Sequence, residues 1–143
     1  MRELQGEDVR LLSVFLRFWL PVLGYVTLIF AVSSVSHLPG PRHIPYLDKI
    51  AHFVEYGILG MLVGRAFRYS GPDSLRKFWF ALAVIAAAAV GFLDEWLQGT
   101  VPGRERSGID LVADVLGIVC GQFALLKVES RWRRKKREER SNR

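Results

Sequence analysis

A run of 16 residues without a charged side chain, Phe78 to Leu93, is the feature that most restricts what this chain can fold into. The indole of Trp79 is its only polar group. A helix in a soluble bundle carries polar residues along one face, and this run has no such face. Extended through Gln98, it is long enough to cross a hydrocarbon core of about 30 Å at about 1.5 Å per residue. We therefore predict a membrane-spanning helix rather than part of a soluble all-α bundle.

Three further apolar blocks predict an all-α integral membrane bundle of four transmembrane helices. The first block contains Pro21, which membrane helices tolerate as a kink, and the second is weakened by His52 and Glu55 in its first two turns. A cleaved signal peptide at the first block is the alternative to a first span. The expected helices cover about residues 11–35, 48–68, 78–98 and 109–127, in a membrane domain of residues 1–128 that is followed by a basic tail at 129–143.

The positions of the basic residues predict the orientation of the four helices. The formal net charge is +6, and 16 of the 20 Lys and Arg residues lie before or at the start of the first block, from the end of the second block to the start of the third, or from Lys127 onward. Because basic residues mark cytoplasmic segments, both termini are expected on the cytoplasmic side. The expected location is the cell (plasma) membrane. The same distribution of charge argues against nucleic acid as a partner, because the basic residues serve the topology. The lipid bilayer is the expected partner. An oligomer is a further possibility.

Small residues in the fourth block predict how it packs. Gly117 and Gly121 are one helical turn apart, a spacing that permits close helix approach. Cys120 beside them is expected to be a small buried packing residue. As the only cysteine, it excludes an intrachain disulfide framework and a multi-cysteine zinc site.

With this orientation, the polar residues of the last three helices fall at one level, near the outer face. Several are spaced four apart on one helical face, as in Asp48, His52 and Tyr56, or in Asp110 and Asp114. Ionisable groups at membrane depth are costly and usually face a bundle interior or water, so they are candidates for a functional site. The acids at this level are Asp48, Glu55, Asp94, Glu95, Glu105, Asp110 and Asp114.

The composition of this constellation leaves several chemistries open. Carboxylates with one imidazole could hold a divalent metal, although no specific metal motif indicates one. They could also supply acid and base groups, or form a pocket in which Arg104 and Arg106 recognise a phosphate or carboxylate. A purely structural network that fastens the helices is the alternative. The predicted catalytic residues are His52, Glu55, Asp94 and Glu95, and the predicted ligand-binding residues are Asp48, Tyr56, Gln98, Arg104, Asp110 and Asp114.

Three ordered motifs in this region resemble the VanZ-like family of small multi-pass membrane proteins. They are Asp48 to Tyr56, Asp94 to Gln98 followed by Pro102-Gly103-Arg104, and Asp110 through Asp114 to Gly117. Ser33 and Ser34 look like the family's serine pair. This chain has Asp114 where the family pattern often has Asn, which changes the potential charge of the site.

The resemblance implies kinship with a founding member associated with resistance to the glycopeptide antibiotic teicoplanin. An outward-facing site would fit a protein that binds or modifies a lipid-linked envelope precursor or a glycopeptide, and whether it is an enzyme stays open. Two other classes are weighed against this one. They are a small ion- or proton-coupled transporter with the intramembrane acids as relay, and a structural or assembly subunit.

Overall fold

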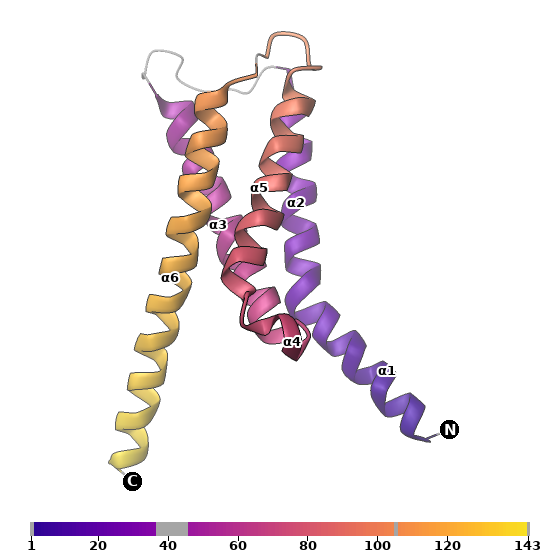
Figure 1. Cartoon of the computed structure of the whole chain (residues 1–143), viewed down its shortest axis with the longest axis vertical. Helices are drawn as coiled ribbons and strands as arrows, with labels where there is room; N and C mark the ends of the chain where they lie inside the picture. Colours follow the sequence, from indigo (N-terminus) through magenta and orange to yellow (C-terminus); the bar gives the residue numbers. More distant parts are fainter. Residues whose placement is uncertain (1, 37–45, 105, 143) are drawn as a thin grey trace.

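The computed structural model describes residues 2–36, 46–104 and 106–142, with side chains described from residue 7 onward. Within these ranges the chain is helical and contains no strand. The elements are α1 (Arg2–Val14), a π-helical turn η1 (Phe15–Trp19), α2 (Leu20–Ser33), α3 (Leu47–Ser70), the short α4 (Asp73–Arg76), α5 (Trp79–Gln98) and α6 (Gly108–Ser141). Figure 1 shows that both ends of the chain lie at the same end of the bundle.

Four helical segments are long and apolar enough to cross a membrane: Glu7–Ser33, Leu47–Ser70, Trp79–Gln98 and Gly108–Ser141. This confirms the predicted all-α bundle of four membrane helices. Large apolar side chains such as Ile85, Phe92 and Phe123 are exposed on its surface. In water such a surface would be unfavourable, whereas against lipid tails it is matched to its surroundings.

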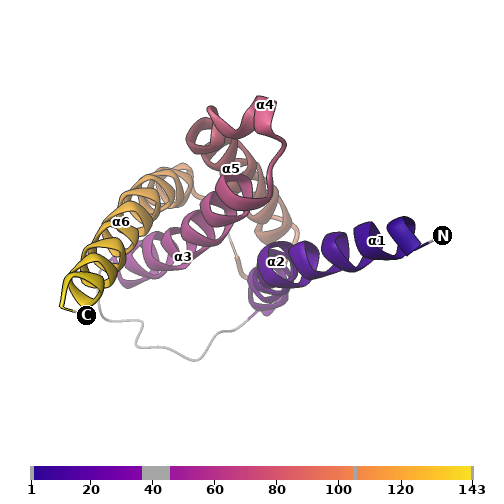
Figure 2. The same ribbon diagram turned by 90° about the horizontal axis from the view of Figure 1, so that it is seen from below.

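The first span bends where Pro21 was expected to kink it. Proline has no N–H to donate, and the chain accommodates it with the π-helical turn that precedes it, in which the Leu20 N–H donates to the Phe15 carbonyl. α1 therefore leans away from α2 and from the rest of the bundle, as the views from the side and from below both show (Figures 1 and 2).

Helix α3 is the centre of the bundle and contacts α2, α5 and α6. Its backbone approaches that of α6 closely, and glycines make this possible. A methyl group on Gly121 would overlap the Gly57 carbonyl, and one on Gly117 would overlap the Phe53 carbonyl. The expectation that Gly117 and Gly121 permit close packing is confirmed. The close approach brings the polar residues at the start of α3 next to those at the start of α6.

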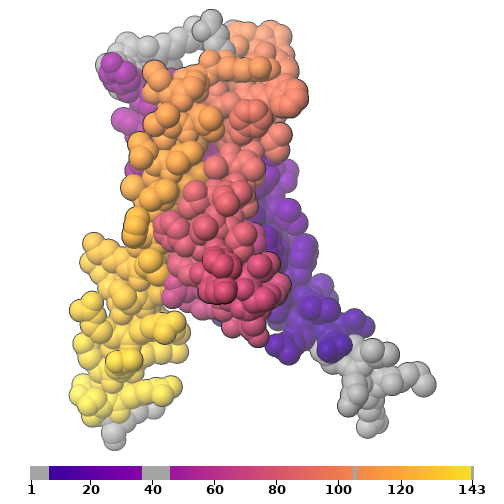
Figure 3. Space-filling model, viewed as in Figure 1, coloured from indigo at the N-terminus to yellow at the C-terminus, as the bar shows by residue number. Residues whose placement is uncertain are grey.

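One sequence-based expectation about α6 differs from the structure. Cys120 is exposed rather than buried, because it lies outside the buried stripe of α6 that includes Gly117 and Gly121. The basic segment after residue 128 is helical, since α6 continues through it to Ser141 and projects beyond the bundle (Figure 3). Most of the predicted loop at residues 36–47 lies outside the described residues.

Candidate functional site

The polar centre of the molecule is formed by one side chain from each of three helices: His52 of α3, Glu95 of α5 and Asp114 of α6. His52 Nδ1 lies 2.9 Å from Asp114 Oδ1. Each of the three residues offers a nitrogen or oxygen atom, and these atoms all lie within 4.8 Å of one another. Asp114 is fully buried and Glu95 is 7% exposed. We refer to these three residues as the His52 cluster.

Tyr56 and Gly91 form the inner wall of the His52 cluster. The fully buried Tyr56 ring is parallel to the His52 imidazole, with 6.2 Å between the ring centroids. A methyl group on Gly91 would lie 3.1 Å from Asp114 Oδ2 and 3.3 Å from the Tyr56 ring. The glycine on α5 therefore makes room for both side chains, which reach it from α6 and α3.

A second group joins the end of α5 to the end of α2. The Gln98 amide donates to Asp94 Oδ2 at 2.9 Å and to the Ser33 hydroxyl at 3.3 Å, and all three side chains are buried. Gln98 thereby orients the Asp94 carboxylate and ties it to the first span. This places Asp94 and Gln98, which spacing put on one helical face, beside Ser33 of the serine pair.

A third group lies at the rim, where α3 and α6 begin. Lys49 Nζ is 2.6 Å from Asp110 Oδ1 and 2.6 Å from Asp48 Oδ2. The Asp110 backbone N–H donates to the Ser107 hydroxyl at 3.3 Å, so Ser107 is the N-cap of α6. Asp48 is largely exposed, and its contact with Lys49 places it at the periphery of the site.

Arg104 is positioned by a tight turn between α5 and α6. The Arg104 N–H donates to the Val101 carbonyl across Pro102 and Gly103, and Gly103 has a φ of 81°, which glycine adopts without strain. The guanidinium donates to the carbonyls of Val35 at 3.1 Å and Val32 at 3.5 Å. Arg104 therefore binds the end of the first span, in addition to any role toward a ligand.

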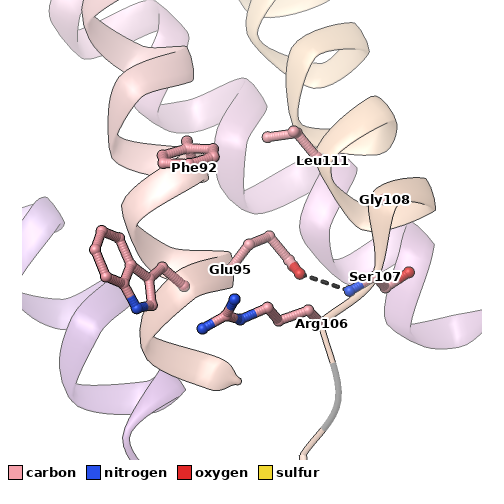
Figure 4. A pocket seen from close by; sticks show the side chains of 7 residues that line it. Phe92, Glu95, Arg106, Ser107, Gly108 and Leu111 are labelled. Atoms are coloured by element: carbon pink, nitrogen blue, oxygen red, sulfur yellow. Dashed lines mark hydrogen bonds between the residues drawn. The ribbon is translucent and has the colours of Figure 1, made fainter. Parts of the chain in front are cut away.

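A pocket of ≈ 390 Å³ opens between α5 and α6 beside the His52 cluster (Figure 4). Its lining combines apolar side chains with a polar floor, and consists of Phe92, Glu95, Trp96, Arg106, Ser107, Gly108 and Leu111. Glu95 Oε2 accepts a hydrogen bond from the Ser107 backbone N–H at 2.8 Å. Glu95 therefore belongs both to the pocket and to the His52 cluster, and it connects the two.

The electrostatics of this end are dominated by buried acids. Asp94, Glu95, Asp110 and Asp114 are each at most 7% exposed. Among the described residues, Lys49 and His52 are the only cationic groups within ion-pair distance of them, facing Asp110 and Asp114. An ion of negative charge in a low-dielectric region is costly unless a cation or several donors face it. The site therefore favours the binding of positive charge near Glu95 and Asp114.

The structure brings together most of the predicted site residues. His52, Tyr56, Glu95 and Asp114 meet in one cluster, Asp94 pairs with Gln98, and Asp110 and Asp48 pair with Lys49. Glu55 is half-buried on the same end of α3, and its carbonyl accepts a hydrogen bond from the Tyr25 hydroxyl at 3.2 Å. Glu105 lies outside the described residues.

Two residues of the site, Lys49 and Ser107, were not among the predicted ones. Lys49 directly follows Asp48 at a helix start, a position that could have indicated a rim ion pair. Ser107 precedes Asp110 by three residues, the spacing of an N-cap before a helix. Arg104 and Arg106 are both candidates for anion recognition, and only the structure distinguishes the pocket-lining Arg106 from Arg104 at the α2 end.

Comparison with known proteins identifies the family of the chain. The family model described as VanZ/LLP1 matches residues 8–128. No curated protein and no solved structure matches the chain. The matched range contains all four membrane-spanning segments up to the basic extension of α6, and every residue of the His52 cluster.

Proposed function

Because this chain belongs to the VanZ/LLP1 family, we propose that it is a plasma-membrane protein that binds, and has the groups to modify, a lipid-linked ligand of the cell envelope. The family's kinship with teicoplanin resistance makes a glycopeptide the alternative ligand. The polar end would face out of the cytoplasm. The positive-inside distribution supports this orientation, since the basic residues concentrate at the end that carries both termini (Figure 1).

The observation that carries the proposal is the pocket between α5 and α6. Phe92, Trp96 and Leu111 give it apolar walls, while Glu95 and Arg106 form a polar floor. Phe92 and Trp96 are exposed on the bundle surface, which membrane lipid would cover. A ligand with an apolar chain and a polar headgroup could enter from the bilayer without leaving it, and such a ligand matches both parts of the lining.

The residues of the site suggest separate roles toward a headgroup. Arg106 is exposed in the pocket and has no ion-pair partner among the described residues, so its guanidinium is available to a phosphate or carboxylate. Glu95 lines the pocket floor and is also a member of the His52 cluster. His52 with Asp114 and Glu95 could act as acid and base groups on a bound headgroup.

Binding can be tested with a dansyl-labelled polyisoprenyl diphosphate, using the protein reconstituted in nanodiscs. Trp96 lines the pocket, so energy transfer from its indole to the dansyl group should report occupancy and should fall in a Trp96→Phe variant. Arg106→Ala should lower the affinity by about 10-fold or more, because a charge-assisted contact to an anion contributes about 1.5–3 kcal/mol. Arg76→Ala, in α4 at the other end, is the matched control.

Two outcomes would count against the proposal. Equal probe affinity in Arg106→Ala and in the Arg76→Ala control would show that Arg106 does not contact the headgroup. Full displacement of the probe by ordinary anionic glycerophospholipid at its bilayer concentration would show that the pocket binds membrane lipids without selectivity. A cellular test runs in parallel: His52→Ala or Asp94→Ala should abolish a glycopeptide-resistance phenotype at unchanged membrane levels.

A structural or assembly role is the second candidate, because the hydrogen bonds of the polar end join helices. Gln98 links α5 to α2, and His52 links α3 to α6. In that case Asp94→Asn should lower thermal stability and function together. A transporter is favoured by no observation of this kind, since the buried acids of the described residues all lie at one end of the bundle. Proton-dependent uptake in proteoliposomes would support it.

A further inference from the structure

We propose that His52, Glu95 and Asp114 form a binding site for a single divalent metal ion that accepts both imidazole and carboxylate ligands, such as Zn²⁺ or Mn²⁺. The three ligands come from three different helices, so the ion would connect α3, α5 and α6. The site does not depend on the ligand proposed for the pocket. It would give this end of the protein a Lewis acid or a structural ion at membrane depth.

The distances are close to those that an ion requires. Ligand atoms of one tetrahedral Zn²⁺ are about 3.4 Å apart, because each lies about 2.1 Å from the metal. The donor atoms of His52, Glu95 and Asp114 lie within 4.8 Å of one another. His52 Nδ1 and Asp114 Oδ1, at 2.9 Å, are already close enough to bind one ion. Side-chain shifts of about 1 Å would close the site.

Unpaired oxygen atoms converge on the same place. Asp114 Oδ2 and Glu95 Oε1 are buried and have no hydrogen-bond partner within the described ranges of the chain. Two buried carboxylate oxygens without partners beside one imidazole are unusual in a packed interior. A cation would satisfy both of them directly.

The charge balance also favours a cation. Lys49 lies within ion-pair distance of Asp110 and Asp48, and Arg104 donates to backbone carbonyls of the first span. In the described part of the chain, the imidazole of His52 is therefore the one cation within ion-pair distance of Asp114, and Glu95 has none. One imidazole cannot balance two buried carboxylates, whereas a divalent ion can.

The donor set selects the class of metal. Imidazole nitrogen suits Zn²⁺, Cu²⁺, Fe²⁺ and Ni²⁺, whereas carboxylate oxygen suits Mg²⁺, Ca²⁺ and Mn²⁺. One nitrogen with carboxylate oxygens, and no sulfur, is intermediate and favours Zn²⁺ or Mn²⁺ over Mg²⁺ or Ca²⁺. Cys120 is exposed on the other face of α6 and takes no part.

The test uses the full-length protein in detergent, stripped with EDTA and equilibrated with ZnCl₂ or MnCl₂ alone. Bound metal is counted by mass spectrometry, and the affinity is measured by titration. The expected result is a single ion per chain, with MgCl₂ and CaCl₂ binding more weakly. His52→Ala and Glu95→Gln should each weaken binding by about 100-fold or more, because loss even of a residue that only supports a ligand costs about 10–100-fold.

Matched variants and a second readout guard against unfolding as the explanation. Glu129→Gln and Asp73→Asn change acids of the same types at the opposite end and should bind the ion as the unchanged protein does. Asp114→Asn keeps one carbonyl oxygen and should give an intermediate affinity. Circular dichroism must show the same helix content in each variant.

Retention of less than a tenth of an ion per chain, or equal retention in Glu95→Gln and Glu129→Gln, would overturn the proposal. Metal bound without binding of the dansyl probe would leave this site standing and refute the proposed function. Probe binding by a protein that takes up no metal would refute this site and leave the proposed function standing.

Discussion

The contact between α3 and α6 should be sensitive to one added methyl group at Gly60. A Cβ there would lie 2.6 Å from the Ile118 carbonyl oxygen and 2.9 Å from its Cα, compared with about 3.4 Å for an ordinary contact. The obstructing atoms are backbone, so no rotamer change can relieve the overlap. The two helices would have to separate by about 0.8 Å, or strain locally, and we expect Gly60→Ala to cost about 1–3 kcal/mol of stability.

Gly24 provides the matched control, because a methyl group on it would meet nothing within 4 Å. Gly24→Ala should be neutral or gain up to about 1 kcal/mol from the higher helix propensity of alanine. The two variants should therefore differ by about 2 kcal/mol, which for a chain of this size corresponds to roughly 4–8 °C in Tm.

The assay is thermal unfolding of the two purified variants in the same detergent, followed by circular dichroism and by fluorescence-detected gel filtration. A Gly60→Ala variant as stable as Gly24→Ala would refute the close α3–α6 contact. It would also remove the basis for placing His52 beside Asp114, because that contact sets the distance between the two helices.

Two further predictions concern the polar end and its orientation. Gln98→Leu removes the donor to Asp94 Oδ2 and should lower stability by about 1–3 kcal/mol, measured as Tm, because a buried acceptor is left without a partner. A Gln98→Leu variant with unchanged Tm would show that this bond contributes nothing. In a Cys120→Ser background, Thr100→Cys should react with an impermeant maleimide on intact spheroplasts, whereas Asn142→Cys should react only after lysis. The opposite pattern would invert the proposed topology.

The sequence predicted the architecture because the relevant signals are local. The uncharged run Phe78–Leu93 and the three other apolar blocks identify the spans from length and hydropathy alone. The kink at Pro21 follows from a missing donor, and the Gly117–Gly121 spacing follows from helical periodicity. Helix ends were less predictable, since charged residues after Lys127 continue α6 without an apolar pattern.

The sequence predicted the depth of the candidate site residues in the membrane, but not which of them contact one another. Spacing placed Asp94 and Gln98 on one face of a helix, and they do form a hydrogen bond. Which of the acids would meet His52 depends on how α3, α5 and α6 rotate about their axes, and no local pattern gives those rotations. For the same reason the different positions of Arg104 and Arg106 became visible only in three dimensions.

X-ray absorption of the full-length protein equilibrated with Zn²⁺ tests most directly whether the polar end is a metal-binding centre formed by His52, Glu95 and Asp114. The account predicts a ligand shell of nitrogen and oxygen at about 2.0–2.2 Å with the multiple scattering of one imidazole, lost in His52→Ala. A sulfur shell at about 2.3 Å, a shell without imidazole, or no bound zinc would contradict it.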